Sequence, residues 1–283
     1  MKYAVVIPAY NEAAFIEKTL DSVSRQKQLP SQVVVVNDNS TDETAQVVTN
    51  LAAQFHWIKL INIQSDAIHL PGSKVIRAFQ NGLEAIDADF EIIVKLDADL
   101  ILPENYFETI LTAFKSDPKI GMAGGFAYIE KNGEWVLENL TDKDHIRGAF
   151  KAYRKQCFAD IGGLRPAMGW DTVDELLARF HGWKVVTFSE LKVKHLKPTG
   201  ARYDETARFK QGEAFYSLGY GFWITSIASA KLAMMKKKPL LFADYLRGYF
   251  KAKSSGKQML VTAQEANWIR HYRWTKMKSK LFG

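Results

Sequence analysis

Over its first hundred residues the chain alternates short apolar runs with amphipathic stretches, and this alternation constrains the fold more than any other feature. The apolar runs predict strands and the amphipathic stretches predict helices. We expect strands at Tyr3–Ile7, Gln32–Val36, Ile58–Ile63 and Glu91–Leu96, and helices at Ala13–Gln26, Asp42–Phe55 and Lys74–Ile86. Such alternation predicts an α/β fold whose parallel, doubly wound sheet is covered by helices on both faces.

The pattern becomes mixed beyond residue 102 and helical beyond residue 204. In the mixed part we expect strands at Ile120–Ile129, Glu134–Leu137 and Lys184–Phe188, a helix at Pro103–Phe114, and a second helix running from a Thr172–Glu175 capping box to Arg179. The last part predicts helices at Ala207–Met235, Leu240–Lys253 and Thr262–Lys280.

The length of 283 residues and the hydrophobic content of 47% suffice for one large core with a smaller appendage. We therefore predict a body over residues 1–204, with halves at 1–102 and 103–204, and a helical C-terminal region over residues 205–283.

The formal net charge of +7 is distributed unevenly. From Glu205 to the end there are 15 Lys and Arg against 4 Asp and Glu, a net of +11, which leaves −4 for residues 1–204. Basic, aromatic-rich helices suit an anionic membrane surface. The alternative is a helical appendage packed on the body with a solvated basic face. A nucleic-acid partner is not expected, because the basic residues are confined to the tail and carboxylates, which repel phosphate, dominate the clusters in the body.

One cysteine, Cys157, excludes an internal disulfide and favours a reducing cytoplasm. The apolar start, Met1–Pro8, is too short for a signal peptide. The apolar segment Phe222–Met235 is interrupted by Lys231 and is shorter than the roughly 20 residues of a membrane span. We predict a cytoplasmic protein without signal peptide or transmembrane helix, whose membrane contact, where present, is peripheral.

Three polar clusters follow predicted strands, at Pro8–Glu12, Asn37–Asp42 and Asp97–Asp99. Ligands of doubly wound sheets bind at the carboxyl ends of the strands, so these clusters are expected to meet at one rim. Strand alternation would send Asp97 and Asp99 to the same side, where two carboxylates can hold a hard divalent cation and, through it, a phosphate.

A series of stretches in chain order resembles the family 2 glycosyltransferases of GT-A fold, and the resemblance covers nearly all of residues 3–200. The stretches are Val6–Glu12, Val36–Asp42, Gly72–Lys74, Leu96–Asp99, Arg147–Arg154, Ile161–Leu164, Gly169–Glu175 and His195. The resemblance implies an inverting transfer of a sugar from a nucleoside diphosphate to a hydroxyl acceptor, in polysaccharide or glycolipid synthesis at the cell surface. It makes a UDP-sugar the default donor and a lipid-linked or polysaccharide hydroxyl the acceptor.

For the nucleotide sugar, the resemblance implies that Asp38 accepts a hydrogen bond from the nucleobase and that Glu12 and Asp97 hold ribose hydroxyls. Lys74, at a helix N-terminus after Gly72, forms an anion site suited to a diphosphate. The same site is expected to include Pro8, Ala9, Tyr10 and Gly148. Glu12 can alternatively be a first-turn acid favoured by the helix dipole, and Lys74 a solvated surface lysine.

The implied cofactor is a divalent metal, Mn²⁺ or Mg²⁺, with Asp99, Asp97 and His195 as ligands. Such a metal would neutralise charge on the departing diphosphate. The alternative for His195 is a structural histidine.

Inversion by a single displacement needs a carboxylate base opposite the leaving group. Asp171 and Asp174 are three residues apart in one predicted helix and share a face, and of the two we favour Asp174. The chain departs here from the family's more usual Glu-Asp pair. Trp170 and Glu175 are assigned to the acceptor side, with a capping role as the alternative for Glu175. Two other functions stay open: a nucleotidyltransferase on a related sheet, and a nucleic-acid-binding protein that uses the basic tail.

Overall fold

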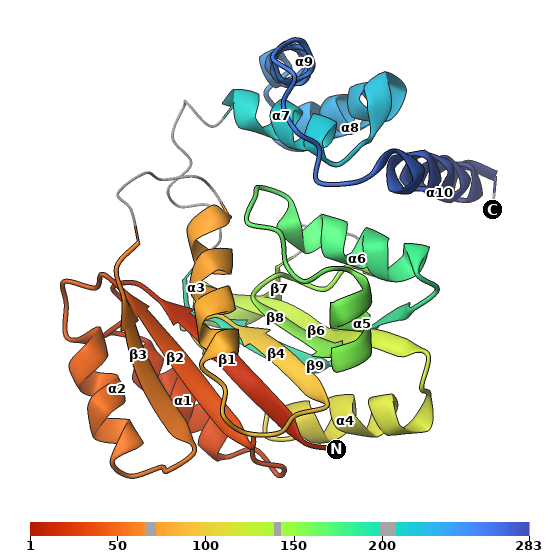
Figure 1. Cartoon of the computed structure of the whole chain (residues 1–283). Helices are drawn as coiled ribbons and strands as arrows, with labels where there is room; N and C mark the ends of the chain where they lie inside the picture. The colour runs from red at the N-terminus through yellow and green to blue at the C-terminus, as the bar shows by residue number, and fades with distance from the viewer. Residues whose placement is uncertain (66–71, 139–142, 198–207, 283) are drawn as a thin grey trace. The chain divides into compact units, whose positions relative to one another are not determined.

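The computed structural model describes residues 1–65, 72–138, 143–197 and 208–282, with the side chains of Arg208 and residues 280–282 left out. The chain forms two compact units, Met1–Thr199 and Gly200–Gly283 (Figure 1). The predicted boundary after residue 204 lies outside the described residues.

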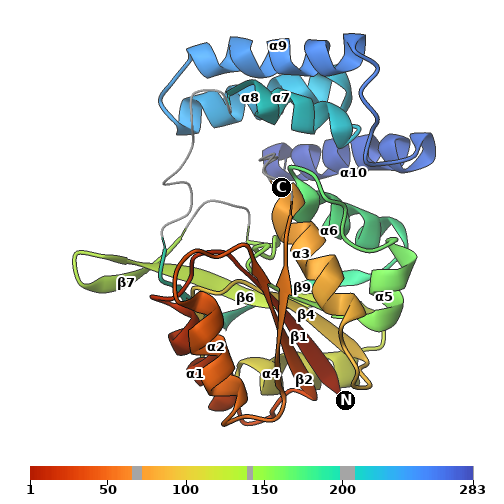
Figure 2. The same cartoon turned by 60° about the vertical axis from the view of Figure 1, so that its left-hand side comes forward.

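The first four strands form the parallel half of the sheet in the N-terminal unit. They are β1 (Tyr3–Ala9), β2 (Gln32–Asp38), β3 (Ile58–Ile63) and β4 (Ile92–Leu96), and they pair in the order β3-β2-β1-β4. The connecting helices are α1 (Ile16–Ser24), α2 (Thr44–Ala52) and α3 (Ser73–Glu84). Figure 2 shows α1 and α2 on one face of the sheet and α3 on the other. The doubly wound sheet predicted from the alternation is thus present.

The second half of the unit extends this sheet with mixed strands. They are β5 (Leu100–Ile101), β6 (Ile120–Lys131), β7 (Glu134–Leu137), β8 (Phe150–Arg154) and β9 (Lys184–His195), with helices α4 (Tyr106–Ser116), α5 (Lys155–Asp160) and α6 (Trp170–Phe180). Strand β8 inserts antiparallel between β4 and β6, and β5 pairs with the end of β9. In the described residues, the strands form one sheet of order β3-β2-β1-β4-β8-β6-β9-β5, with β7 on β6.

Three elements of the N-terminal unit, β5, β8 and α5, were not predicted from the sequence. Two predicted elements have other bounds than expected. Strand β9 continues to His195 instead of ending at Phe188, because Leu191, Val193 and His195 are buried and alternate with exposed lysines. Helix α6 begins at Trp170 after Gly169, whose φ of 86° suits glycine. Thr172 therefore lies inside the first turn, and the predicted capping box with Glu175 is wrong.

The C-terminal unit contains α7 (Arg208–Ser217), α8 (Gly221–Met235), α9 (Leu240–Ser254) and α10 (Ala263–Phe282). The single helix predicted over Ala207–Met235 is broken between α7 and α8, where Gly219 and Gly221 have φ of 70° and 69°. A capping box does begin α10: the Thr262 N–H donates to Glu265 Oε2 at 2.6 Å, and the Glu265 N–H donates to Thr262 Oγ1 at 3.3 Å.

Glycines allow α7 and α9 to pack closely. A Cβ on Gly212 would lie 1.8 Å from the Tyr245 carbonyl oxygen, and one on Gly248 would lie 2.1 Å from that of Phe209. Within the described ranges, no helix has the length and apolar character that crossing a membrane requires.

Candidate active site

The loops after β1 and β2 are joined by side-chain hydrogen bonds. Asn11, with φ of 53°, accepts the Thr41 N–H on its Oδ1 at 2.8 Å and donates its own N–H to Ser40 Oγ at 3.0 Å. The Glu12 N–H donates to Thr44 Oγ1 at 2.8 Å. These bonds fix the loop that follows Pro8 and Ala9, and Tyr10 stands exposed at its start.

Asp38 ends β2 as a buried carboxylate. Its Oδ1 accepts the Ser65 N–H at 3.1 Å and its Oδ2 accepts the Ser65 hydroxyl at 2.8 Å. Both oxygens can still accept a further hydrogen bond, because a carboxylate has about four lone-pair positions. Asp38 can therefore accept a hydrogen bond from a nucleobase N–H and keep both hydrogen bonds from Ser65.

Glu12 is paired with a residue that the sequence analysis did not single out. This residue is Lys197, which lies just after the end of β9. Its Nζ is 2.5 Å from Glu12 Oε2. Burial raises the pKa of Glu12, and Lys197 opposes this shift. The pair ties the loop after β1 to the end of β9.

The segment Asp97–Asp99 is a turn between β4 and β5, so the strand alternation that we invoked for it does not apply. The Asp97 N–H donates to the Ala149 carbonyl at 2.7 Å, and its carboxylate is bonded to Lys95. Burial raises the pKa of Asp97, Lys95 lowers it, and the negative charge of Asp99 raises it further. Asp97 thus has a cation partner of its own, which reduces its value as a metal ligand.

Pairing of β5 with β9 brings Asp99 beside His195. Leu100 stands opposite His195 in the ladder, and Asp99 Oδ2 lies 3.4 Å from His195 Nε2. On its other side, His195 Nδ1 faces Glu138 Oε2 at 3.7 Å, and Glu138 pairs with Arg147 at 3.0 Å. Burial lowers the pKa of His195, but the two carboxylates outweigh it and raise the value to about 9.

The donor set at this point fits a divalent metal only in part. Asp99 and His195 offer an oxygen and an imidazole nitrogen at adjacent positions, and Glu138 supports the imidazole as carboxylates commonly do for metal-bound histidines. Within the described ranges, no three His, Cys, Asp or Glu side chains gather as a full ligand set. A metal here would take its remaining ligands from a substrate diphosphate and water, as Mg²⁺ and similar ions do.

Two buried lysines, Lys95 on β4 and Lys151 on β8, stand directly opposite each other in the sheet. Both ammonium groups lie over the Trp170 ring, at 5.4 and 5.8 Å from its centroid. Opposed like charges are unfavourable, so each lysine needs its own anion. Lys95 has Asp97, and Lys151 has Asp174 and Glu175.

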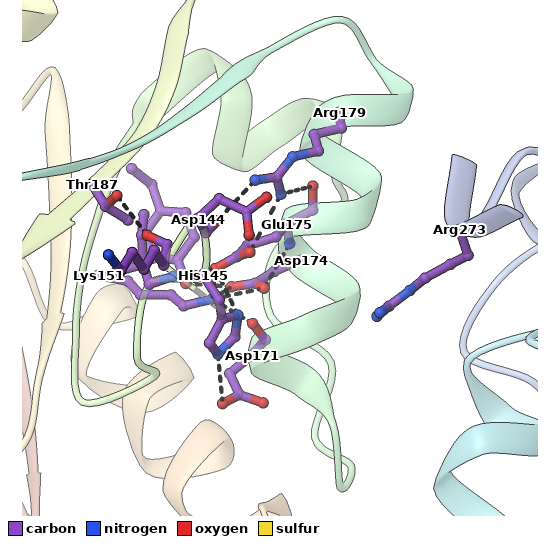
Figure 3. Close-up of polar contacts among 12 residues, drawn as sticks. Asp144, His145, Lys151, Asp171, Asp174, Glu175, Arg179, Thr187 and Arg273 are labelled. Carbon is purple, nitrogen blue, oxygen red and sulfur yellow. Dashed lines mark hydrogen bonds and ion pairs between the residues drawn. The ribbon is translucent and has the colours of Figure 1, made fainter. Parts of the chain in front are cut away.

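Lys151 is the centre of a buried cluster under the start of α6 (Figure 3). Its Nζ donates to both Asp174 oxygens at 3.0 Å, to Glu175 Oε1 at 3.1 Å and to the Asp171 carbonyl at 2.5 Å. Asp174 also accepts the Tyr153 hydroxyl at 2.7 Å. The carboxylate of Asp174 is fully engaged and its residue is 1% exposed.

Glu175 is held as firmly as Asp174. Its Oε1 accepts the Ile146 N–H at 2.8 Å and lies 3.1 Å from His145 Nδ1, and its Oε2 lies 3.3 Å from Arg179. Burial opposes its ionisation, but Lys151, His145 and Arg179 outweigh this effect and lower the pKa of Glu175 to about 2. Glu175 therefore acts within the fold, and its assignment to the acceptor side is corrected.

Asp171 is the carboxylate of α6 that remains accessible. Its side chain is 35% exposed, and its Oδ2 lies 3.8 Å from His145 Nε2. Figure 3 shows His145 between Asp171 and Glu175. Because a base must reach the acceptor hydroxyl, the geometry favours Asp171 over Asp174, opposite to our sequence-based preference.

Trp170 and Gly148 pack against each other. A Cβ on Gly148 would lie 2.7 Å from the Trp170 ring and 3.0 Å from Asp171 Cβ, so this glycine makes room for Trp170. Trp170 is buried and also contacts the start of α3: a Cβ on Gly72 would lie 3.1 Å from its ring. Stacking of an acceptor sugar on Trp170 is therefore not supported. Lys74 is half-buried in the first turn of α3, two residues after Gly72.

Five residues of the site were missed in the sequence analysis: Lys95, Glu138, His145, Lys151 and Lys197. A charged residue within an apolar strand was the available signal for Lys95, which stands in Ile92–Leu96. The other four residues reach their partners through contacts between segments that are far apart in the sequence. No local pattern in the sequence indicates such contacts.

Comparisons with known proteins agree with this architecture. A family model described as "Glycosyl transferase family 2" matches residues 4–165. A poly-beta-1,6-N-acetyl-D-glucosamine synthase of Staphylococcus aureus is 24% identical in an alignment of 186 residues that covers 59% of this chain and 41% of that protein. The synthase of the same name from Staphylococcus epidermidis is 22% identical, and the alignment again covers 59% of this chain and 41% of that protein. The chain thus spans less than half the length of these curated relatives.

Among solved structures, the chain is similar to the mannosyltransferase PcManGT from Pyrobaculum calidifontis in complex with GDP-Man and Mn2+. The TM-score is 0.57 at 16% identity, covering 98% of this chain and 80% of that one. It is also similar to S. aureus TarS 1-349 in complex with UDP-GlcNAc, with a TM-score of 0.55 at 19% identity over 95% and 78% of the two chains. At these identities the likeness shows a shared fold.

Proposed function

The chain belongs to glycosyl transferase family 2 and has the GT-A fold, and from this premise we propose that it is an inverting hexosyltransferase. In this proposal it moves a sugar from a nucleoside diphosphate to a hydroxyl acceptor. The observation that carries this proposal is the pairing of β5 with β9. It places Asp99 Oδ2 3.4 Å from His195 Nε2, beside the turn that follows β4 and contains Asp97.

The donor is proposed to bind along the rim from β2 to β4. Asp38 would accept the N–H of the base, Glu12 and Asp97 would hold ribose hydroxyls, and Lys74 with the N-terminus of α3 would face the diphosphate. A UDP-sugar is the default donor, and a TarS structure with UDP-GlcNAc among the similar folds supports it. Pro8 and Ala9 at the end of β1, and the exposed Tyr10 that follows, are proposed to line this site.

Asp99 and His195 are proposed to hold a divalent metal, with Asp97 nearby. The similar PcManGT structure contains Mn2+, which supports Mn²⁺ ahead of Mg²⁺. When bound, such an ion supplies positive charge that stabilises the leaving diphosphate. The protein's own contribution is orientation: Glu138 aligns the His195 ring, and Lys95 holds Asp97.

Asp171 is proposed as the base that takes the acceptor proton. Its backbone carbonyl is bonded to Lys151 and its carboxylate faces His145, so the buried cluster sets its position. Attack by the acceptor hydroxyl opposite the diphosphate forms the glycosidic bond as the old one breaks, and the proton passes to Asp171. One such displacement inverts the anomeric centre.

The acceptor and setting follow from the relatives and from charge. Relatives that make an N-acetylglucosamine polymer support a role in polysaccharide synthesis at the cell surface, with a polysaccharide or lipid-linked hydroxyl as acceptor. The net charge of +11 after residue 204 supports peripheral attachment to an anionic membrane. The cytoplasmic leaflet carries such lipids, so we propose its surface as the site of action.

Calorimetric titration with UDP, GDP and deoxythymidine diphosphate, each with and without Mn²⁺, tests the proposal. We expect one nucleotide to bind in a metal-dependent manner in the wild type and not in Asp99→Ala. Metal-independent binding, or release of pyrophosphate from a nucleoside triphosphate and a sugar phosphate, would contradict it; the second result would indicate a nucleotidyltransferase.

A further inference from the structure

Helix α8 of the C-terminal unit is apolar on all sides and leaves large apolar side chains exposed. Its buried positions are Ile224, Thr225, Ser229 and Ala233. In the described part of the chain, the Thr225 and Ser229 hydroxyls are buried without a hydrogen-bond partner. Apart from Ile224, the inner face of this helix thus carries small or polar side chains, while larger apolar side chains stay in contact with solvent.

The outer face of α8 consists of Trp223, Ile227, Lys231 and Met234, which recur at helical spacing along one side. Trp223 is 70% exposed and Met234 is 78% exposed. The turn into α9 continues the same character, because Leu240 is 81% exposed and follows three exposed lysines, Lys236–Lys238. We call these four α8 residues and this turn the α8 face.

Charge identifies the partner that would cover the α8 face. From Leu218 to Ala243 the sequence contains four lysines and no acidic residue. Such a surface repels a second copy of itself and attracts anions. Lysine side chains can lay their aliphatic stems on apolar neighbours and extend their ammonium groups to a charged boundary, and tryptophan favours the same boundary.

We infer that the α8 face inserts into the headgroup region of an anionic bilayer. Trp223, Ile227 and Met234 would enter the boundary of the acyl chains, while Lys231 and Lys236–Lys238 would contact lipid phosphates. This inference rests on the membrane attachment proposed above and assigns it to one surface.

Flotation of the full chain with vesicles tests the assignment. One vesicle contains phosphatidylcholine alone and the other contains phosphatidylcholine with phosphatidylglycerol. We expect the wild type to float with the anionic vesicles, and the double variant Trp223→Ser/Ile227→Ser to bind them at least about tenfold more weakly. The matched control is Leu29→Ser, which removes an apolar side chain that is 52% exposed in the N-terminal unit and should leave flotation unchanged.

Charge reversal provides a second, independent variant. Lys236→Glu/Lys237→Glu/Lys238→Glu should lower binding to the anionic vesicles about a hundredfold or more. The control reverses the same amount of charge on exposed lysines of the N-terminal unit, Lys18, Lys115 and Lys131, and should have a much smaller effect. Equal losses in both triple variants would mean that only the net charge matters, which contradicts a specific face.

The outcomes separate the two claims. A wild type that does not prefer anionic vesicles refutes the attachment itself. A wild type that floats while both α8-face variants float equally well refutes the face and leaves the attachment standing. Elution of the wild type as a dimer and of Trp223→Ser/Ile227→Ser as a monomer would show that the face joins two copies. A far-UV circular dichroism spectrum like that of the wild type confirms for each variant that its helices have folded.

Discussion

The two units of the chain treat apolar and charged side chains in opposite ways. Thirteen large hydrophobic side chains are exposed in the described residues, and only three of them, Tyr10, Leu29 and Leu137, lie in the N-terminal unit. The N-terminal unit instead buries charge: Lys95 and Lys151 lie inside its sheet with their carboxylate partners. The C-terminal unit keeps its lysines outside beside exposed aromatic and aliphatic groups.

This contrast indicates different tasks. Burying charged groups costs free energy of folding. Buried charges that are paired are also held at a fixed geometry, which suits groups whose position matters. In the N-terminal unit, buried Lys151 holds the backbone of Asp171, and buried Lys95 holds Asp97 in the turn that carries Asp99. A small helical unit cannot cover all its apolar surface, and what it leaves exposed is available to a partner. Variants that separate the units test this division.

The largest expected effect is on transfer by the N-terminal unit. Asp171→Asn removes the proposed base, and kcat should fall by about a thousandfold because general-base catalysis contributes on that scale. Metal-dependent nucleotide binding and vesicle binding should stay as in the wild type. Asp89→Asn, whose side chain is 93% exposed, is the control. Full activity of Asp171→Asn would show that another group is the base.

The next effect is on stability. Lys151→Met leaves Asp174 and Glu175 buried without their shared cation, so the free energy of unfolding should fall by about 3–5 kcal/mol. Lys231→Met on the exposed side of α8 should change it by less than about 0.5 kcal/mol. Urea unfolding of the three proteins measures the difference, and similar stability of both variants would show that the buried cluster contributes little.

Acid should weaken the N-terminal unit through Glu175. Its pKa is lowered from 4.5 to about 2, so it contributes stability above about pH 4.5, and this contribution is lost as the pH falls through about 2. The shift corresponds to about 3 kcal/mol. Between about pH 6 and pH 2 the wild type should therefore lose about 3 kcal/mol more stability than Glu175→Gln, which has no such group to protonate. Glu17→Gln, on the exposed side of α1, should follow the wild type.

The smallest expected effect concerns metal affinity. Glu138→Gln keeps the size of the side chain but weakens its hold on His195, and partners of this kind change metal affinity by about tenfold. Calorimetry should show a weaker Mn²⁺-dependent nucleotide binding and an unchanged metal-independent part. If both parts are unchanged, Glu138 serves Arg147 alone.

The sequence by itself determined the parallel half of the sheet and the polar clusters at the ends of its strands. Apolar runs rich in β-branched residues, such as Val33–Val36, predict buried strands. Their alternation with amphipathic helices predicts a parallel sheet with polar clusters at the carboxyl ends of its strands. Those signals are local, so a single sequence contains them. The break between α7 and α8 was missed, although Gly219 and Gly221 were a local signal for it.

Only the tertiary structure decided which carboxylate is buried and which is free. Asp171 and Asp174 have the same chemistry and lie on one helix, and the difference comes from Lys151 and Tyr153, which β8 brings under α6 from 20 or more residues earlier. The place of Glu138 beside His195 likewise depends on the packing of β6 between β7 and β9. Pairing across such separations is set by the whole sheet, because no short stretch of sequence records which strand its neighbour will be.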